Sequence, residues 1–155
     1  MVSNKQNPSS ATYTASETQK GWDDLLNICY DENKIAKCDN LTSKRGAKTT
    51  PAPITMKQFD FNLPTDASIS LVKLRYRDRI KGITEVLPEI EAPTITIKYG
   101  DGLTHTVTGK KPDNNMNTHE LNVINLGLTG EQINSPDFSV VLSYPNNTGE
   151  YGGSV

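Results

Sequence analysis

The segment from residue 59 to residue 77 constrains the fold most strongly, because apolar and polar residues alternate on both sides of a turn. Phe59, Phe61 and Leu63 alternate with polar residues, which is typical of a strand with one buried face. Pro64 then predicts a break, because proline cannot donate a hydrogen bond to a strand ladder. The segment therefore predicts two β-strands joined by a tight polar turn.

The second of these strands changes the face on which its apolar side chains lie. Ile69 and Leu71 share one parity, whereas Val72, Leu74 and Tyr76 share the other. One face cannot hold both sets unless the strand contains a bulge or a twist near Leu71. This pattern indicates an antiparallel sheet.

Further short strands follow, separated by turn residues and without any long helix. We expect strands over residues 54–63, 69–80, 94–99, 103–107, 120–126 and 138–144, a hairpin turn at 100–102, and a turn or one helical turn at 129–134. The long connections 81–93 and 110–119 indicate strands that pass between two sheets. The chain is thus predicted to be all-β, an antiparallel β-sandwich of jelly-roll type.

The N-terminal residues differ in composition from the rest of the chain. Residues 1–20 are rich in Ser, Thr, Asn and Gln, so we expect a flexible polar arm that is disordered alone or ordered against a partner. Residues 21–155 form the sandwich domain. Trp22, Leu25 and Cys29 fit helical spacing, which predicts either a short helix or a docked irregular segment whose Trp fills the edge of the core.

Charge and cysteine content exclude several classes of protein. With 16 basic and 18 acidic residues, the chain lacks the overall charge excess of a nucleic-acid-binding protein, and the basic loop 44–48 is short. No apolar stretch is long enough to span a membrane. Cys29 and Cys38 are predicted to be ordinary thiols, with a local disulfide as the alternative. We expect no nucleic-acid partner and no membrane insertion.

The sequence offers little reactive chemistry. It contains no nucleophile elbow and no phosphate-binding glycine loop, so we expect no catalytic residue and no cofactor. The acidic pairs 23–24 and 31–32 could suit calcium, but the Asp-x-Asp-x-Asp-Gly loop is absent and acids near a helix start are usually helix-favouring charges, so no metal is predicted. His105 fits a hydrogen-bonded position in a sheet. His119, next to Glu120, would need a surrounding pocket to act as a base.

Aromatic side chains are the remaining candidates for ligand or assembly contacts, because sugars commonly stack on aromatic rings. They are Trp22, Tyr30, Tyr99, Tyr144 and Tyr151. For Tyr99 and Tyr144, which lie at strand ends, a place in the core is the favoured interpretation.

Three short patterns, in order along the chain, resemble jelly-roll domains of phage and prophage tail or head appendage (fibre) proteins and of microbial surface adhesins. The early pattern is Gly21-Trp22 with Asn27 and Asp31; the middle one is Pro64, Ala67, Ile69, Val72, Leu74, Tyr76 and Arg77; the late one is Leu128-Thr129, Asn134 and Phe138 to Leu142. The chain departs from that family at Leu71, where a small residue is usual, and at 125–127, where a tryptophan is common. It also stops at 152–155, where the family's closing strand would begin. A longer native chain or a neighbouring subunit would supply that strand.

The resemblance implies a non-enzymatic viral structural protein, located in the virion. It would be a domain of a phage tail or head appendage that acts in assembly or host attachment. The expected partners are other virion proteins, further copies of the chain in a homo-oligomer, and a host surface glycan. The alternative is a carbohydrate-binding or adhesin module at a microbial cell surface.

Overall fold

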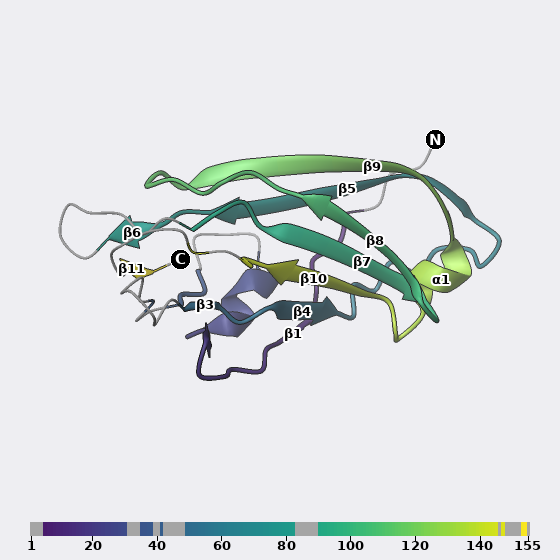
Figure 1. The fold of residues 1–155 in the computed structure, drawn as a ribbon. Helices are drawn as coiled ribbons and strands as arrows, with labels where there is room; N and C mark the ends of the chain where they lie inside the picture. Colours follow the sequence, from purple (N-terminus) through teal and green to yellow (C-terminus); the bar gives the residue numbers. More distant parts are fainter. Residues whose placement is uncertain are drawn as a thin grey trace.

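The computed structural model describes residues 5–30, 35–38, 41, 49–82, 90–145, 147 and 153–154. Most of the regular structure is antiparallel β-sheet, which confirms the all-β prediction (Figure 1). The largest sheet has five strands in the order β1-β4-β10-β7-β8: β1 Ser10–Thr12, β4 Ile54–Lys57, β10 Ser139–Ser143, β7 Thr94–Gly100 and β8 Leu103–Thr108. The predicted strands at 94–99 and 103–107 and the hairpin between them are confirmed.

The two longest strands form a separate antiparallel ribbon, β5 (Ser68–Asp78) with β9 (Asn117–Thr129). The ribbon runs along the five-stranded sheet in Figure 1. A hydrophobic cluster that includes Ile97 and Val140 from the sheet and Val123 and Leu128 from β9 fills the space between the two layers. The strands on either side of connections 81–93 and 110–119 belong to different sheets, as the sequence predicted.

The remaining elements are short. They are a parallel pair of β2 (Gln19–Lys20) and β3 (Thr50–Pro51), an antiparallel pair of β6 (Lys81–Gly82) and β11 (Gly153–Ser154), a 3-10 helix η1 (Leu25–Cys29) and a helical turn α1 (Gly130–Asn134). No helix in the described segments is long and apolar enough to span a membrane.

The predicted irregularity near Leu71 is confirmed. Ile69 is opposite Leu128, but Leu71 is opposite Ile124, so three residues of β9 face one residue of β5. Within this irregular stretch of β9, Asn125 and Gly127 adopt positive φ angles of 60° and 65°. The bulge turns Leu71 outward while Ile69 and Val72 both pack inward.

The first predicted strand is wrong beyond Lys57. Gln58, Asp60 and Asn62 adopt φ angles of 59°, 54° and 51°, in the left-handed region that a regular strand does not use. The alternation of faces nevertheless holds, because the apolar residues between them, Phe59, Phe61 and Leu63, still pack against the core between the layers. Alternating polarity therefore gave the correct side-chain direction but the wrong backbone.

The predicted turn at 129–134 is the helical turn α1, and a capping box starts it. The Thr129 hydroxyl accepts a hydrogen bond from the backbone N–H of Gln132 (3.3 Å), and the Gln132 side chain accepts one from the N–H of Thr129 (2.9 Å). Gly130 lies so close to the carbonyl oxygen of Pro64 that a Cβ at this position would overlap it. The turn after residue 63 and α1 are thus packed backbone against backbone.

Part of the segment expected to be a polar arm lies on the sheet. Residues 10–12 form β1 and pair with β4, and Ala11 belongs to a second hydrophobic cluster with Trp22 and Ile54. Trp22 donates a hydrogen bond from Nε1 to the carbonyl oxygen of Ala52 (2.7 Å). Both predicted features are present in this region: Trp22 is docked in the core, and a short 3-10 helix follows it. Disorder of the arm in isolation stays a prediction.

Candidate functional site

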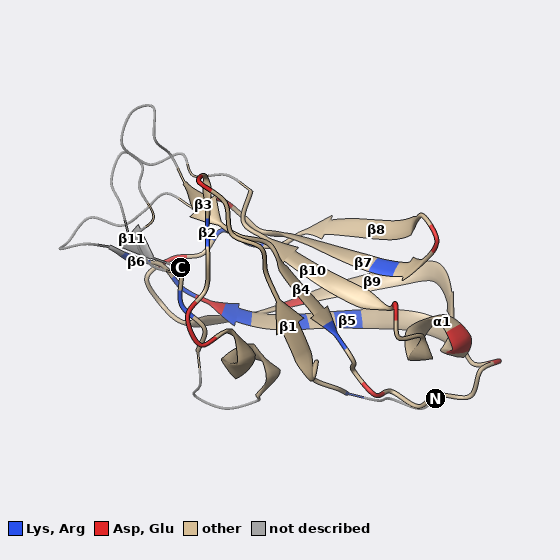
Figure 2. Ribbon diagram, turned by 90° about the horizontal axis from the view of Figure 1, so that it is seen from below, with Lys and Arg blue, Asp and Glu red and all other residues tan. Residues whose placement is uncertain are grey.

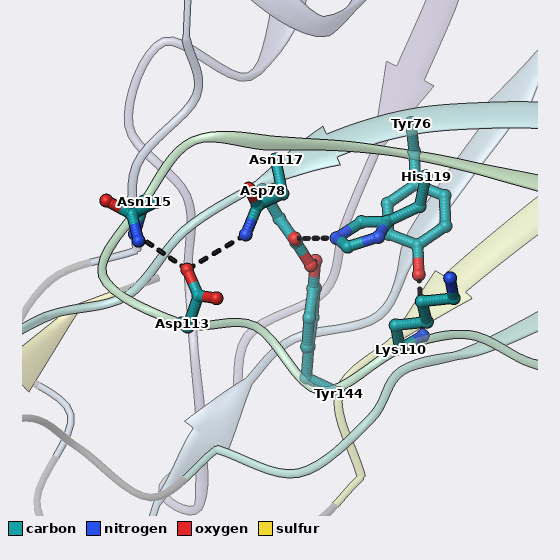
Figure 3. Close-up of polar contacts among 8 residues, drawn as sticks. All are labelled: Tyr76, Asp78, Lys110, Asp113, Asn115, Asn117, His119 and Tyr144. Atoms are coloured by element: carbon teal, nitrogen blue, oxygen red, sulfur yellow. Dashed lines mark hydrogen bonds and ion pairs between the residues drawn. The ribbon is translucent and has the colours of Figure 1, made fainter.

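The most concentrated polar chemistry in the described structure is a buried cluster of Asp78, His119 and Tyr144 at one end of the two layers (Figure 3). Asp78 is the last residue of β5 and continues the inward-facing series of Val72, Leu74 and Tyr76. His119 lies on β9, and Tyr144 directly follows β10. The cluster therefore joins the ribbon to the five-stranded sheet.

Asp78 is the hub of this cluster. His119 Nε2 lies 2.8 Å from Asp78 Oδ1, and Tyr144 Oη donates a hydrogen bond to Asp78 Oδ2 over 2.8 Å. All three side chains are buried: His119 is 8% exposed, Asp78 is 7% exposed and Tyr144 is 2% exposed. Both carboxylate oxygens thus have a partner, as burial of such a group requires.

Two further contacts surround the cluster. The Tyr76 ring lies against the His119 ring with centroids 4.8 Å apart, and Tyr76 Oη accepts a hydrogen bond from the backbone N–H of Lys110 (3.0 Å). Asp113 Oδ1 accepts hydrogen bonds from the N–H of Asn115 (2.7 Å) and from Asn117 Nδ2 (2.9 Å). These bonds shape the loop between β8 and β9 beside the cluster (Figure 3).

Burial controls the ionisation of the cluster. Desolvation raises the pKa of Asp78, and the hydrogen bonds from Tyr144 and His119 partly oppose this increase. Desolvation and the nearby Asp78 raise the pKa of Tyr144 well above its ordinary value. Tyr144 therefore remains a protonated donor to Asp78 at neutral pH. Because so little of the three side chains is exposed, the arrangement is suited to holding the two layers together.

The four predicted aromatic candidates that the structure describes are not brought together at one surface. Trp22 (8% exposed) and Tyr144 lie in the core with ring centroids 6.4 Å apart, so they offer little surface to a ligand or partner. Tyr99 is half-buried against the cluster between the layers. Tyr30 is 56% exposed, and Tyr151 lies outside the described residues.

A surface hollow of about 280 Å³ lies beside the irregular segment after β4. Phe59 and Phe61 stack in its wall with ring centroids 5.8 Å apart. Asn134 also lines it, and its amide holds the backbone of Leu63 by accepting from the N–H (3.0 Å) and donating to the carbonyl oxygen (2.5 Å). The hollow thus combines aromatic rings with amide groups.

The metal and cysteine predictions have separate outcomes. Cys29 and Cys38 form no disulfide, so the thiol interpretation is confirmed over the disulfide. Within the described part of the chain, no three His, Cys, Asp or Glu side chains gather as metal ligands would. Asp31 and Glu32, of the acidic group considered for calcium, and the basic loop 44–48 lie outside the described residues.

Strand parity could have located the buried cluster. Asp78 has the same parity as Tyr76, and His119 has the same parity as Leu121 and Val123, so both were on inward faces. The sequence interpretation instead compared His119 with its neighbour Glu120, which points outward. His105 lies on β8 as expected, but its side chain makes no hydrogen bond to another described residue.

Comparison of the chain with protein-family models, with curated proteins and with solved structures finds no significant match.

Proposed function

We propose that this protein is a non-enzymatic structural domain of a virion appendage, a phage tail or head fibre or adaptor, that acts by assembling with further copies of itself and other virion proteins. The observation that carries the proposal is the outer edge of β9. From Asn117 to Ile124 this strand makes eight consecutive pairs with β5, and within the described part of the chain nothing pairs with its other side.

An unpaired strand edge of this length is a template for another chain. Natural monomers protect such edges with charged side chains, especially lysine, with proline or with β-bulges. Between Asn117 and Ile124, β9 contains no Lys, Arg or Pro and no register shift, and Glu120 is its only acidic residue. The opposite edge of the ribbon, β5, does carry charges, at Lys73, Arg75 and Arg77. The two edges therefore differ, and the edge of β9, which carries only one acidic residue and no basic one, is the one suited to assembly.

The finer architecture that we propose is a jelly-roll sandwich. The chain passes from the five-stranded sheet to the ribbon between β4 and β5, returns before β7, crosses again between β8 and β9, and returns to β10. Repeated passage between two facing layers is the connectivity of jelly rolls. A ribbon of two strands is a narrow second layer, and strands from a neighbouring subunit would widen it.

Hydrogen exchange of the backbone amides tests this proposal. In an isolated ribbon, alternate amides of β9 point away from β5 and exchange quickly, whereas pairing with another copy protects all of them. We expect protection of consecutive amides between Asn117 and Ile124 in concentrated protein, with loss of every second one on dilution. Fast exchange of alternate amides at all concentrations would contradict assembly through this edge.

The second candidate function is a carbohydrate-binding or adhesin module, and the hollow beside Phe59 and Phe61 favours it. Its test is binding of the protein to an array of neutral glycans, with Asn62→Ala as the variant and Asn114→Ala as the control. Asn62 lines the hollow, whereas Asn114 is exposed in the loop between β8 and β9. Glycan binding that only Asn62→Ala abolishes would support this candidate, and no binding would refute it.

A further inference from the structure

The outer face of β5 carries a row of basic side chains. Its exposed positions alternate with the inward-facing Leu74, Tyr76 and Asp78, and the same alternation continues through the buried Ile80. The basic row, as we name it, consists of Lys73, Arg75, Arg77, Arg79 and Lys81. Blue segments recur along β5 and into β6 in Figure 2.

The basic row is a local concentration of charge in a chain whose net charge is −2. It holds five of the 16 basic residues and three of the four arginines within nine positions, 73–81. The only acidic residue in that stretch is Asp78, whose side chain points inward and is buried. The basic row is not a run of adjacent basic residues, because its members alternate with inward-facing side chains along the strand.

These cations are largely free of partners in the fold. Lys73 Nζ lies 3.9 Å from Glu120 Oε2, and both side chains are about half exposed. Within the described part of the chain, Arg75, Arg77 and Arg79 form no ion pair and no side-chain hydrogen bond. Charged residues on an edge strand do discourage pairing, but that purpose does not require a row of one sign.

We infer that the basic row binds an anionic polysaccharide that carries carboxylate or sulfate groups. Residues two apart on a strand are about 6.6–6.8 Å apart, so the row presents cations at regular intervals along a line. Arginine binds such groups through two parallel N–H donors. Across the ribbon, Thr118 lies opposite Arg77 and Asn122 lies opposite Lys73, where their side chains can hydrogen-bond to sugar hydroxyls.

The same face is poorly suited to nucleic acid. Single-stranded nucleic acid binds by stacking its bases on aromatic side chains beside a positive groove. The outward positions of β5 and β9 hold no aromatic residue, because Tyr76 and His119 both face inward.

Binding of defined polymers to the full chain tests the inference. The probes are dextran sulfate, polygalacturonate, uncharged dextran and an oligothymidylate, each at low and at physiological salt. The variant is Arg75→Gln with Arg77→Gln. The matched control is Lys57→Gln with Lys98→Gln, which removes the same charge from β4 and β7. We expect binding to at least one of the two anionic polysaccharides, weakened by salt, and roughly tenfold or more weaker in the β5 variant but not in the control.

Three results would overturn the inference. They are equal weakening in the two double variants, binding of the oligothymidylate as tight as that of the polysaccharides, and no binding of either anionic polysaccharide. The inference rests on the host-attachment part of the proposed function for the source of the polymer. The mass of the protein in solution distinguishes polysaccharide binding from assembly. If the protein is an oligomer but binds neither anionic polysaccharide, binding by the basic row is refuted and assembly through β9 is not.

Discussion

Tyr144 donates a 2.8 Å hydrogen bond to Asp78, and this bond connects the end of one sheet to the end of the other. Tyr144 follows β10 of the five-stranded sheet, whereas Asp78 ends β5 of the ribbon. His119, on the adjacent strand β9, occupies the second carboxylate oxygen. The three side chains thus form a polar connection within an otherwise apolar interface.

Tyr144→Phe is expected to destabilise the protein by about 1–3 kcal/mol, because it leaves one oxygen of a buried carboxylate without its donor. Denaturant unfolding measures this change in the free energy of unfolding. Tyr13→Phe is the matched control, since Tyr13 is 40% exposed and a surface change of this kind stays within about 0.5 kcal/mol. An equal effect of the two variants would show that the buried hydrogen bond contributes nothing.

Asp78 also predicts how stability depends on pH. Because the pKa of Asp78 is raised in the folded protein, the folded state holds its proton more tightly than the unfolded state does. The contribution of this group is therefore fully present below the unfolded value of 3.8 and is lost as pH rises through the higher folded pKa. Asp78→Asn removes this titration, so the Tm of the wild type should fall relative to that of the variant as pH increases over this range. A Tm difference that does not change with pH would contradict the assignment.

Gly130 tests the close packing of α1 on the turn after residue 63. Gly130→Ala should cost about 2–3 kcal/mol, because the new methyl group would overlap the carbonyl oxygen of Pro64 and one of the two backbones must move. Glu131→Ala, at an exposed position of the same helical turn, should change stability by less than about 0.5 kcal/mol. Thermal unfolding of both variants provides the comparison, and a neutral Gly130→Ala would argue against this packing.

The N-terminal segment gives a prediction about truncation. A chain that begins at Ser9 keeps the pairing of β1 with β4, whereas a chain that begins at Gly21 loses that pairing and the buried Ala11. We therefore expect the Tm of the first to match that of the full chain and the Tm of the second to be several degrees lower. If both truncated chains unfold at the temperature of the full chain, β1 contributes nothing to the folded domain.

The sequence predicted the fold class because strand alternation and turn residues are local signals. The hairpin around Gly100–Gly102, the irregularity near Leu71 and the helical turn after Thr129 are all confirmed for that reason. The predicted strand is wrong beyond Lys57 because Gln58, Asp60 and Asn62 adopt left-handed backbone conformations. The alternation of polar and apolar residues does not indicate these conformations.

The functional features were harder to predict because they depend on residues far apart in the chain. His119 and Asp78 are 41 residues apart, and only the pairing of β5 with β9 brings them together. Strand parity marks both as inward-facing, but the register that makes them neighbours comes from the packed fold. The basic row, in contrast, was visible as alternate charges from Lys73 to Lys81 once that stretch is interpreted as a strand with one outer face.

The mass of the full chain in solution, measured by light scattering over a range of concentrations, shows whether the protein assembles through the edge of β9. The variant is Thr118→Lys with Asn122→Lys, which places charges on β9, and the control is Thr104→Lys with Thr106→Lys on β8, an edge strand of the five-stranded sheet. If the chain assembles through β9, the wild type and the control are a defined oligomer and the β9 variant is a monomer. A wild-type protein that remains monomeric at all concentrations, or an oligomer that only the β8 variant disrupts, would contradict assembly through β9.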